Sequence, residues 1–272
     1  MIKIFNESCL DTMQKLPKNS INIVLTSPFY NTNKKAGKKR TLQNSVIKDG
    51  QYSYIRYDRH VDNMTDEDYC DFTVSLFNGF NRVLSENGSV LYNICYGSEN
   101  TEGMFKAINS IITRTVFTIA DVIVWKKSNA FPNSCSPNKL TRIWEFVFIF
   151  CRKPELKTFK CNKKVTSLRK TGQKAYENIL NFIEAKNNDG YCPYNKATFS
   201  TDLCKKLLSL SMRLVMKSQS TTHLWGAVQQ LLPAKRWDLI ATEVKYQRTK
   251  LNGRTKDLLE KVNLVHRGLM SY

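Results

Sequence analysis

Residues 21–31 read Ile-Asn-Ile-Val-Leu-Thr-Ser-Pro-Phe-Tyr-Asn, and this stretch decides the fold. Its opening part, Ile21–Thr26, is rich in β-branched residues and predicts a strand. Ser27 and Pro28 follow at the end of that strand. Open α/β sheets bind their ligands at the carboxyl ends of their strands, so Ser27 stands where such a sheet places its chemistry. A plain turn that leaves the sheet is the alternative.

Strands and helices alternate on both sides of this stretch. Thr65 precedes three acidic residues, and acidic residues favour the first turn of a helix. The apolar pattern predicts strands at Ile2–Phe5, Ser89–Ile94, Phe117–Trp125 and Glu145–Phe150, and helices at Ser8–Leu16, from Thr65 onward, at Met104–Thr113 and at Ala197–Leu210, with a turn at Asn87-Gly88. This alternation predicts an α/β fold with a doubly wound sheet.

Two segments interrupt the alternation. Residues 31–62 are polar and basic and have no periodicity, and a connection of this length is usually functional or disordered. From Lys153 to Lys186 the composition shifts to Lys, Thr, Asn and Arg. That shift indicates a small insert outside the core.

The charge of the chain favours a polyanionic partner. Its 272 residues include 42 basic and 23 acidic side chains, which gives a net charge of +19 and a pI near 9.6. Nucleic acid is the favoured partner, because each phosphate contact releases condensed counterions. An anionic membrane surface, or a merely soluble basic protein, is the alternative. No apolar run approaches the roughly 20 residues of a spanning helix, and the first residues do not resemble a signal peptide, so we expect a cytoplasmic protein.

The cysteines do not predict a metal site or a disulfide framework. The eight of them are scattered without a C-x-x-C pair, and only three histidines accompany them. We therefore expect no metal, and we expect reduced, buried thiols. Cys192-Pro193 reverses the Pro-Cys order of the nucleophile that methylates carbon 5 of cytosine, so a covalent mechanism of that kind is not expected.

The segment Thr26–Asn31 closely resembles the Thr-Ser-Pro-Pro-Tyr motif of DNA amino-methyltransferases, which use S-adenosylmethionine to methylate N4 of cytosine or N6 of adenine. Later segments resemble the strands and the helix start that follow this motif in the family: Asn87–Leu91, Val122–Lys127, Thr141–Phe148 and Ala197–Ser200. The catalytic motif precedes the cofactor segment, as in the family's β class of restriction-modification enzymes. The resemblance implies a Rossmann-like methyltransferase sheet, circularly permuted and with a small inserted target-recognition region.

The resemblance also implies a role for the residues of the motif. An exocyclic amino nitrogen is a poor nucleophile because its lone pair is delocalised into the ring, and acceptors aimed at its protons hold it closer to tetrahedral. The Ser27 hydroxyl and the Pro28 carbonyl would be these acceptors, and Tyr30 would stack on a base flipped out of the duplex. Phe29 stands where the family has a second proline, and the loss of that proline would loosen the acceptor geometry.

The same resemblance divides the chain. Residues 1–152 would form the catalytic half, with a mobile basic loop at 31–62, residues 153–193 the target-recognition region, and residues 194–272 the cofactor-binding half. Contacts to the cofactor would come from Thr198, Phe199, Ser200 and Glu243, and contacts to the DNA backbone from Lys34, Lys35, Lys38, Lys39 and Arg40. The alternatives are that residues 31–62 form a solvated loop without DNA contacts, and that Glu243 is a solvated surface acid without a cofactor contact. The implied partners are double-stranded DNA and a cognate restriction endonuclease.

The Gly-rich cofactor turn of the family, Asp-Pro-Phe-Met-Gly-Ser-Gly-Thr-Thr, has no counterpart in this sequence. Nothing between Met212 and Trp225 could form it. Most amino acids have several codons, so the residues from Thr221 to Gln230 can be encoded in more than one way. If the third base of each codon is read with the first two bases of the next codon, some of these encodings spell the motif in full. We interpret residues 211–239 as translated in a shifted frame, which ends before Ile240. A sequencing error and a decayed gene are the two explanations.

Three functions fit these observations. The first is site-specific methylation of duplex DNA at cytosine N4 or adenine N6, as the modification half of a restriction-modification system, and serine in the first motif position favours cytosine. The second is a catalytically inactive DNA-binding protein descended from such an enzyme, which cofactor binding would distinguish. Methylation of RNA or of a protein glutamine is the third, and the basic insert favours duplex DNA over it.

Overall fold

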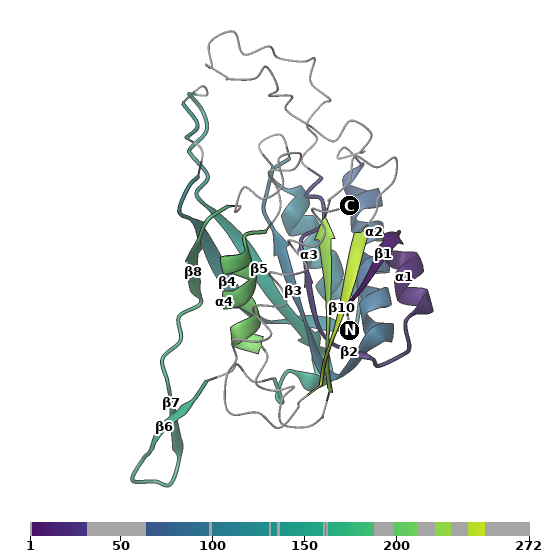
Figure 1. The fold of residues 1–272 in the computed structure, drawn as a ribbon. Helices are drawn as coiled ribbons and strands as arrows, with labels where there is room; N and C mark the ends of the chain where they lie inside the picture. The colour runs from purple at the N-terminus through teal and green to yellow at the C-terminus, as the bar shows by residue number, and fades with distance from the viewer. Residues whose placement is uncertain are drawn as a thin grey trace.

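The computed structural model describes residues 2–31, 64–97, 100–130, 132–134, 137–159, 161, 163–187, 199–211, 221–229 and 239–247. Figure 1 shows them as a twisted central sheet with helices on both faces. The predicted doubly wound α/β arrangement is therefore confirmed.

The central sheet has eight strands in the order β1-β10-β9-β2-β3-β5-β4-β8. β2 (Ile21–Thr26) runs parallel to β3 (Leu84–Ile94) on one side and to β9 (Thr221–Gln229) on the other. The other strands are β1 (Ile2–Glu7), β4 (Phe117–Lys127), β5 (Trp144–Arg152), β8 (Phe182–Ala185) and β10 (Leu239–Gln247). β9 lies beside β2 although it comes much later in the chain, which agrees with the permuted order inferred from the motifs.

Among the described helices, three cover one face of the sheet and one covers the other. α1 (Cys9–Lys15), α2 (Asp66–Val83) and α3 (Gly103–Arg114) share a core with Val24 and Tyr92. α4 (Thr201–Ser211) packs its leucines on the opposite face, against alternate residues of β2 and β3. No helix in the described part of the chain is both long enough and apolar enough to span a membrane.

Two helices begin where the sequence predicted. The Ser8 hydroxyl caps α1 by accepting from the Leu10 amide at 3.3 Å, and the Thr65 hydroxyl caps α2 by accepting from the Asp68 amide at 3.1 Å. Such caps satisfy amides that the first turn of a helix leaves unpaired.

Phe77 of α2 is the centre of an aromatic core that joins this helix to three strands. Its ring lies edge-on to four buried rings, with centroids 4.9–5.3 Å away, which belong to Phe80, Tyr92, Phe117 and Phe150. Each such pair contributes about 0.5–1.5 kcal/mol beyond the burial of its area. The cluster fixes β3, β4 and β5 relative to one another, and these strands carry the site described below.

The turn predicted at Asn87-Gly88 lies inside β3, so that prediction is wrong. Asn87 has a positive φ of 56°, and the pairing of β2 with β3 shifts register at this point. A bulge of this kind absorbs extra residues without ending the strand. A Cβ on Gly88 would lie 3.0 Å from the Ser85 carbonyl oxygen, so glycine suits the close approach. The local turn signal marks an irregularity within a strand.

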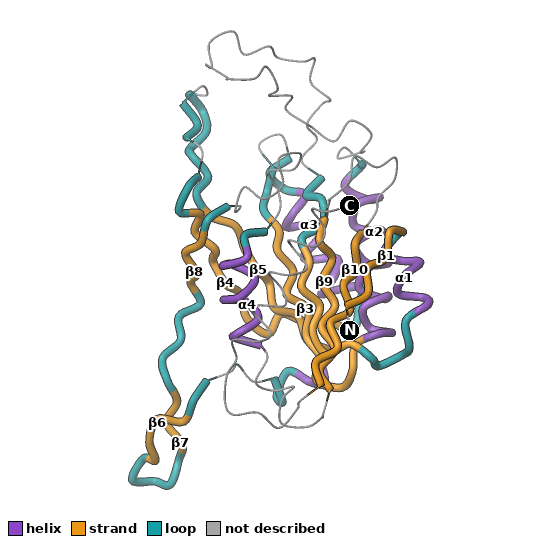
Figure 2. Tube along the Cα trace, in the orientation of Figure 1, coloured by secondary structure: helices purple, strands orange, loops and turns teal. Residues whose placement is uncertain are grey.

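The segment from Lys153 to Lys186 is only partly separate from the core. After the short helix η1 (Lys153–Glu155), β6 (Val165–Leu168) and β7 (Lys174–Tyr176) form a hairpin of their own, which projects from the sheet in Figure 2. The chain then returns as β8, which extends the central sheet parallel to β4 and buries every second residue. The edge strand escaped the sequence analysis because it has only four residues and lies in a segment rich in Lys, Thr, Asn and Arg.

Candidate active site

Polar residues gather at one edge of the sheet, where β2 and β3 end and β5 begins. Ser27 follows the last residue of β2, and Asn93 is the residue before the end of β3. Glu145 stands near the start of β5, which is antiparallel to both of its neighbours, and Lys127 ends β4. Because β2 pairs with β3, β3 with β5 and β5 with β4, residues far apart in the sequence meet here.

Four side chains form one hydrogen-bond network. The Tyr30 hydroxyl lies 3.0 Å from Ser27 Oγ, 2.8 Å from Asn93 Oδ1 and 2.8 Å from Glu145 Oε2. Ser27 Oγ also lies 3.3 Å from Asn93 Oδ1. Asn93 Nδ2 donates to the Phe146 carbonyl at 2.9 Å, which leaves Asn93 Oδ1 facing the two hydroxyls. The polar atoms of the Ser-Pro-Phe-Tyr segment are thus tied to β3 and β5.

An ion pair extends the network to β4. Lys127 Nζ lies 2.5 Å from Glu145 Oε1, and the two side chains are 17% and 10% exposed, so solvent screens the pair little. Burial, followed by the Glu145 charge, raises the pKa of Tyr30 well above its ordinary value, and the hydrogen bond with Ser27 opposes that rise. Tyr30 is therefore protonated at neutral pH and has a proton to donate.

Phe29 holds the turn between Pro28 and Tyr30 by packing. Its ring lies 5.1 Å from the Tyr69 ring and 5.2 Å from the Phe72 ring, both on α2. The Tyr69 hydroxyl donates to the Phe29 carbonyl at 2.6 Å. The residue that departs from the family motif is anchored at both its side chain and its backbone, which is a different restraint from that of a proline.

Asn31 links the residues that precede segment 32–63 to those that follow it. The segment itself lies outside the described residues. Its Nδ2 donates to the Met64 carbonyl at 3.0 Å, and its own carbonyl accepts from Asn100 Nδ2 at 3.1 Å. Asn100 donates also to Asp66 Oδ1 at 3.0 Å. Asn31 has a positive φ of 48°, which asparagine tolerates better than most residues. The residues on either side of the segment therefore meet next to the Ser27 site.

The predicted cofactor residues at the start of α4 have structural partners. The Ser200 hydroxyl is buried and caps α4, accepting from the Leu203 amide at 3.2 Å. The Phe199 ring lies 6.3 Å from the Trp125 ring. Trp125 is buried, and its Nε1 donates to the Ala185 carbonyl at 3.2 Å, so it is a packed aromatic near the end of β4.

The structure does not describe the side chains of the other predicted site residues. Glu243 lies in β10, where its backbone pairs with Lys3 and Trp225. Outside the described residues lie Thr198, Lys34, Lys35, Lys38, Lys39 and Arg40.

Three residues of the site were missed as functional in the sequence: Asn93, Glu145 and Lys127. Each stands in or beside an apolar run, and each occupies the strand end nearest to Ser27. The rule that pointed to Ser27, a polar residue at the carboxyl end of a strand, applies also to Asn93 and Lys127, although it does not say which of them contact Ser27. It does not cover Glu145, which stands near the amino end of an antiparallel strand.

The described cysteines are free thiols, and those in the core are Cys9, Cys70, Cys95 and Cys151. Within the described ranges, no cluster of His, Cys, Asp or Glu side chains is arranged to hold a metal ion.

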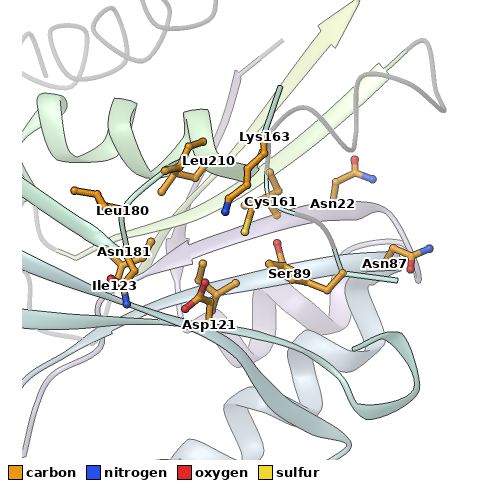
Figure 3. A pocket seen from close by; sticks show the side chains of 14 residues that line it. Asn22, Asn87, Ser89, Asp121, Ile123, Cys161, Lys163, Leu180, Asn181 and Leu210 are labelled. Carbon is orange, nitrogen blue, oxygen red and sulfur yellow. The ribbon is translucent and has the colours of Figure 1, made fainter. Parts of the chain in front are cut away.

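A hollow of about 710 Å³ lies on the α4 face of the sheet, away from Ser27. Figure 3 shows Asn22 and Ser89 beside it, from the starts of the paired parts of β2 and β3, together with Asp121 and Lys163. The hollow is therefore near the amino ends of these strands, whereas the Ser27 network is at their carboxyl ends. Open α/β sheets place their chemistry at the carboxyl ends, so the Ser27 network is the better candidate for an active site.

Comparison with known proteins identifies a family and a fold for the chain. A model of the DNA methylase family that covers the N6 and N4 enzymes matches residues 21–232. The cytosine-N4-specific PvuII DNA methyltransferase is similar in fold, with a TM-score of 0.50 and 15% sequence identity over 76% of this chain and 69% of that one. The structure of M1.HpyAVI gives a TM-score of 0.41 and 13% identity over 80% of this chain and 74% of that one. No curated protein matches the chain.

Proposed function

Because the chain belongs to the DNA methylase family of N6 and N4 enzymes, we propose that it transfers a methyl group from S-adenosylmethionine to an exocyclic amino nitrogen in duplex DNA. We propose cytosine N4 as the target rather than adenine N6, because serine occupies the first position of the motif. The Ser27 network is the observation that carries the proposal.

Ser27 would act as a hydrogen-bond acceptor for the amino group, together with the Pro28 carbonyl. Its hydroxyl stands at the end of a central strand and is held by Tyr30 and Asn93. An acceptor fixed before the reaction stabilises the charge that develops on the amino nitrogen without further reorganisation. The Tyr30 ring is half-buried and its hydroxyl is anchored, which suits a platform on which a flipped base stacks.

DNA would be bound by two basic segments. The residues on both sides of segment 32–63 meet at the site, so the segment that carries Lys34, Lys35, Lys38, Lys39 and Arg40 begins and ends there. In the target-recognition region 153–193, the end of β8 lies beside Lys127, whereas Figure 2 shows the β6–β7 hairpin at the opposite end of the sheet. We propose that the residues that follow β8 contribute most to recognition near the flipped base.

A methylation assay tests the activity. Purified protein would be incubated with duplex DNA and methyl-labelled S-adenosylmethionine, and the digested DNA would be analysed for N4-methylcytosine and N6-methyladenine. Ser27→Ala is expected to lower kcat by about 10²- to 10³-fold, the usual effect of removing one group that stabilises transition-state charge. Ser20→Ala is the control, because the Ser20 hydroxyl donates to the Pro17 carbonyl at the exposed start of the same strand. Equal activity of both variants would exclude Ser27 from the reaction.

A second candidate function is that of an inactive DNA-binding protein, and β9 is the observation that favours it. Thr221–Gln229 forms an extended strand that pairs with β2 and β10. In the shifted frame, the same stretch would encode the Gly-rich cofactor turn. A segment paired on both sides as a strand does not form a turn at a helix start, so residues 221–229 would not supply the cofactor turn in the present frame.

Resequencing of the codons for residues 205–245 separates the two candidates. A gene that encodes the Gly-rich turn supports the enzyme, and its product should bind S-adenosylmethionine in a calorimeter. A gene that keeps the present frame supports the inactive protein, which should bind DNA but neither bind the cofactor nor methylate DNA.

A cognate restriction endonuclease and a place in the cytoplasm belong to the same proposal. Cells that express the active protein should contain DNA that resists one site-specific endonuclease and is cut when Ser27 is replaced by alanine. DNA that stays sensitive to every endonuclease tested, in spite of methylation measured in vitro, would argue against the modification role.

A further inference from the structure

The network around Tyr30 contains more acceptors than hydroxyl protons. Tyr30 has one proton, and two acceptors lie 2.8 Å from its oxygen, Asn93 Oδ1 and Glu145 Oε2. Asn93 cannot turn its amide nitrogen toward Tyr30 without losing the bond from Nδ2 to the Phe146 carbonyl. Ser27 carries the other hydroxyl proton of the described network, and its oxygen lies 3.0 Å from the Tyr30 oxygen and 3.3 Å from Asn93 Oδ1.

The charge on Glu145 decides which acceptor takes the Tyr30 proton. Lys127 pairs with Glu145 Oε1, which leaves the lone pairs of Oε2 directed at Tyr30. A carboxylate is a stronger acceptor than an amide carbonyl, so Tyr30 donates to Glu145. The Tyr30 oxygen and Asn93 Oδ1 can then each accept a hydrogen bond. Within the described network, the Ser27 hydroxyl is the donor that lies within reach of both.

We propose that Glu145, held by Lys127, is a positioning residue that directs the Ser27 proton into the protein through Tyr30. The lone pairs of Ser27 Oγ then face away from the network, where they can accept from the amino group of a base. A serine hydroxyl that rotated freely would present its proton to that amino group in part of the population, and two donors that face each other repel. The inference rests on the proposed role of Ser27 as an acceptor and names the residues that impose it.

The variant Glu145→Gln tests the direction of the hydrogen bonds while keeping the size of the side chain. Its amide oxygen should face the Lys127 ammonium, so its amide nitrogen should face Tyr30 and donate to the Tyr30 oxygen. Tyr30 must then donate to Asn93 Oδ1, so the Ser27 proton competes with a second donor at each of its inward acceptors. We expect kcat to fall about 10- to 100-fold, less than for loss of a group in direct contact with the transition state, and the KM for DNA to remain unchanged.

Asp71→Asn is the matched control. Asp71 is also a carboxylate paired with a cation, because its Oδ1 lies 2.7 Å from Arg114 Nη2. Both partners of that pair are largely exposed, and they lie on α2 and α3, outside the Ser27 network and the proposed DNA-binding segments. Asp71→Asn is expected to leave kcat unchanged. A Glu145→Gln variant that folds and keeps the kcat of the original protein would overturn the proposal.

Titration of Tyr30 tests the network without any need for activity. Fluorotyrosine incorporated into the protein would be followed by ¹⁹F NMR against pH, with Tyr30→Phe used to assign the signal. Burial raises the pKa of Tyr30 most, the charge and the hydrogen bond of Glu145 raise it further, and Cys95 adds a smaller electrostatic contribution. Glu145→Gln should therefore lower the pKa of Tyr30, and Asp71→Asn should not.

The two measurements separate this inference from the proposed function. A protein that never methylates DNA, but in which Glu145→Gln lowers the pKa of Tyr30, would lack the proposed function and still have the proposed contact between Glu145 and Tyr30. An unchanged pKa of Tyr30 in Glu145→Gln would overturn the inference whether or not the protein is active.

Discussion

Phe29 shows how one side chain can replace the backbone restraint of a proline. It is 4% exposed and packs between Tyr69 and Phe72, while the family motif has a second proline at this position. Phe29→Ala is expected to lower the free energy of unfolding by about 3–5 kcal/mol, because it leaves a cavity in a packed core. Urea unfolding would measure the loss.

Phe105→Ala is the control for this prediction. Phe105 lies on α3 and is 60% exposed, so its removal should change the free energy of unfolding by no more than about 0.5 kcal/mol. Equal losses in the two variants would mean that Phe29 does not pack as described.

The reactivity of two buried thiols, those of Cys9 and Cys95, should depend on pH. Burial raises the pKa of Cys9 and of Cys95 to about 11, and the Glu145 charge adds to the rise at Cys95. The thiolate is the reactive form, so both should resist iodoacetamide at about pH 8 in the folded protein and react more as the pH rises toward their pKa. Mass spectrometry of the labelled peptides would measure this, and rapid labelling of either thiol before unfolding would contradict it.

The residues of the site differ in how far the sequence could predict them. Ser27 and Tyr30 could be found because a single strand and the turn after it carry both. The partners of Tyr30 could not, because Asn93 and Glu145 come from strands whose neighbours and register are set by the whole sheet. Long-range pairing decides which polar side chains share a hydrogen bond, and a local pattern does not contain it.

At the scale of elements, Arg152 ties β5 to the end of α2. Its guanidinium donates to the carbonyls of Asn81, Leu84 and Ser85, to the Asn81 side chain and to Glu155. An ammonium cannot reproduce this fork of donors, so Arg152→Lys should lower the free energy of unfolding by about 1.5–3 kcal/mol. Chemical denaturation would measure the change.

Arg114→Lys is the matched control at this scale. Arg114 donates to Asp71 at 2.7 Å, and both side chains are largely exposed. An exposed pair of this kind contributes about 0–1 kcal/mol, so the substitution should be nearly neutral. If Arg152→Lys were equally neutral, the link between β5 and α2 would not depend on the guanidinium.

Elements with strong local signals could be predicted, and elements formed by pairing could not. β2 has the predicted bounds, and α2 begins after its predicted cap, because the strand's residues and the Thr65 cap act locally. β3 continues past Asn87 because β2 pairs with the residues on both sides of the bulge, at Leu84 and from Ser89 onward. β8 is a strand because β4 offers it an edge, and its four residues are too short a run for a local pattern to predict.

At the scale of the whole molecule, the alternation of strands and helices predicted the class of fold but not the neighbours of each strand. The order of the family motifs predicted a circularly permuted sheet, and β9, a late strand, lies beside the Ser27 strand. In the present frame these residues form a strand between β2 and β10. The described part of the sheet is therefore continuous through β9, and residues 221–229 do not form the Gly-rich turn.

The reading frame of the codons for residues 211–239 should therefore decide whether the protein binds S-adenosylmethionine and is stabilised by it. A ligand that binds only the folded state stabilises it by about 2.7 kcal/mol at a hundredfold excess over its Kd. A protein with the shifted frame restored should show this gain as a rise in Tm, and the present chain should show none. Thermal unfolding of both proteins, with and without the cofactor, measures the difference. A restored protein without a rise would refute the frame interpretation, whereas a rise in the present chain would refute the inactive candidate and place the cofactor on residues other than a Gly-rich turn.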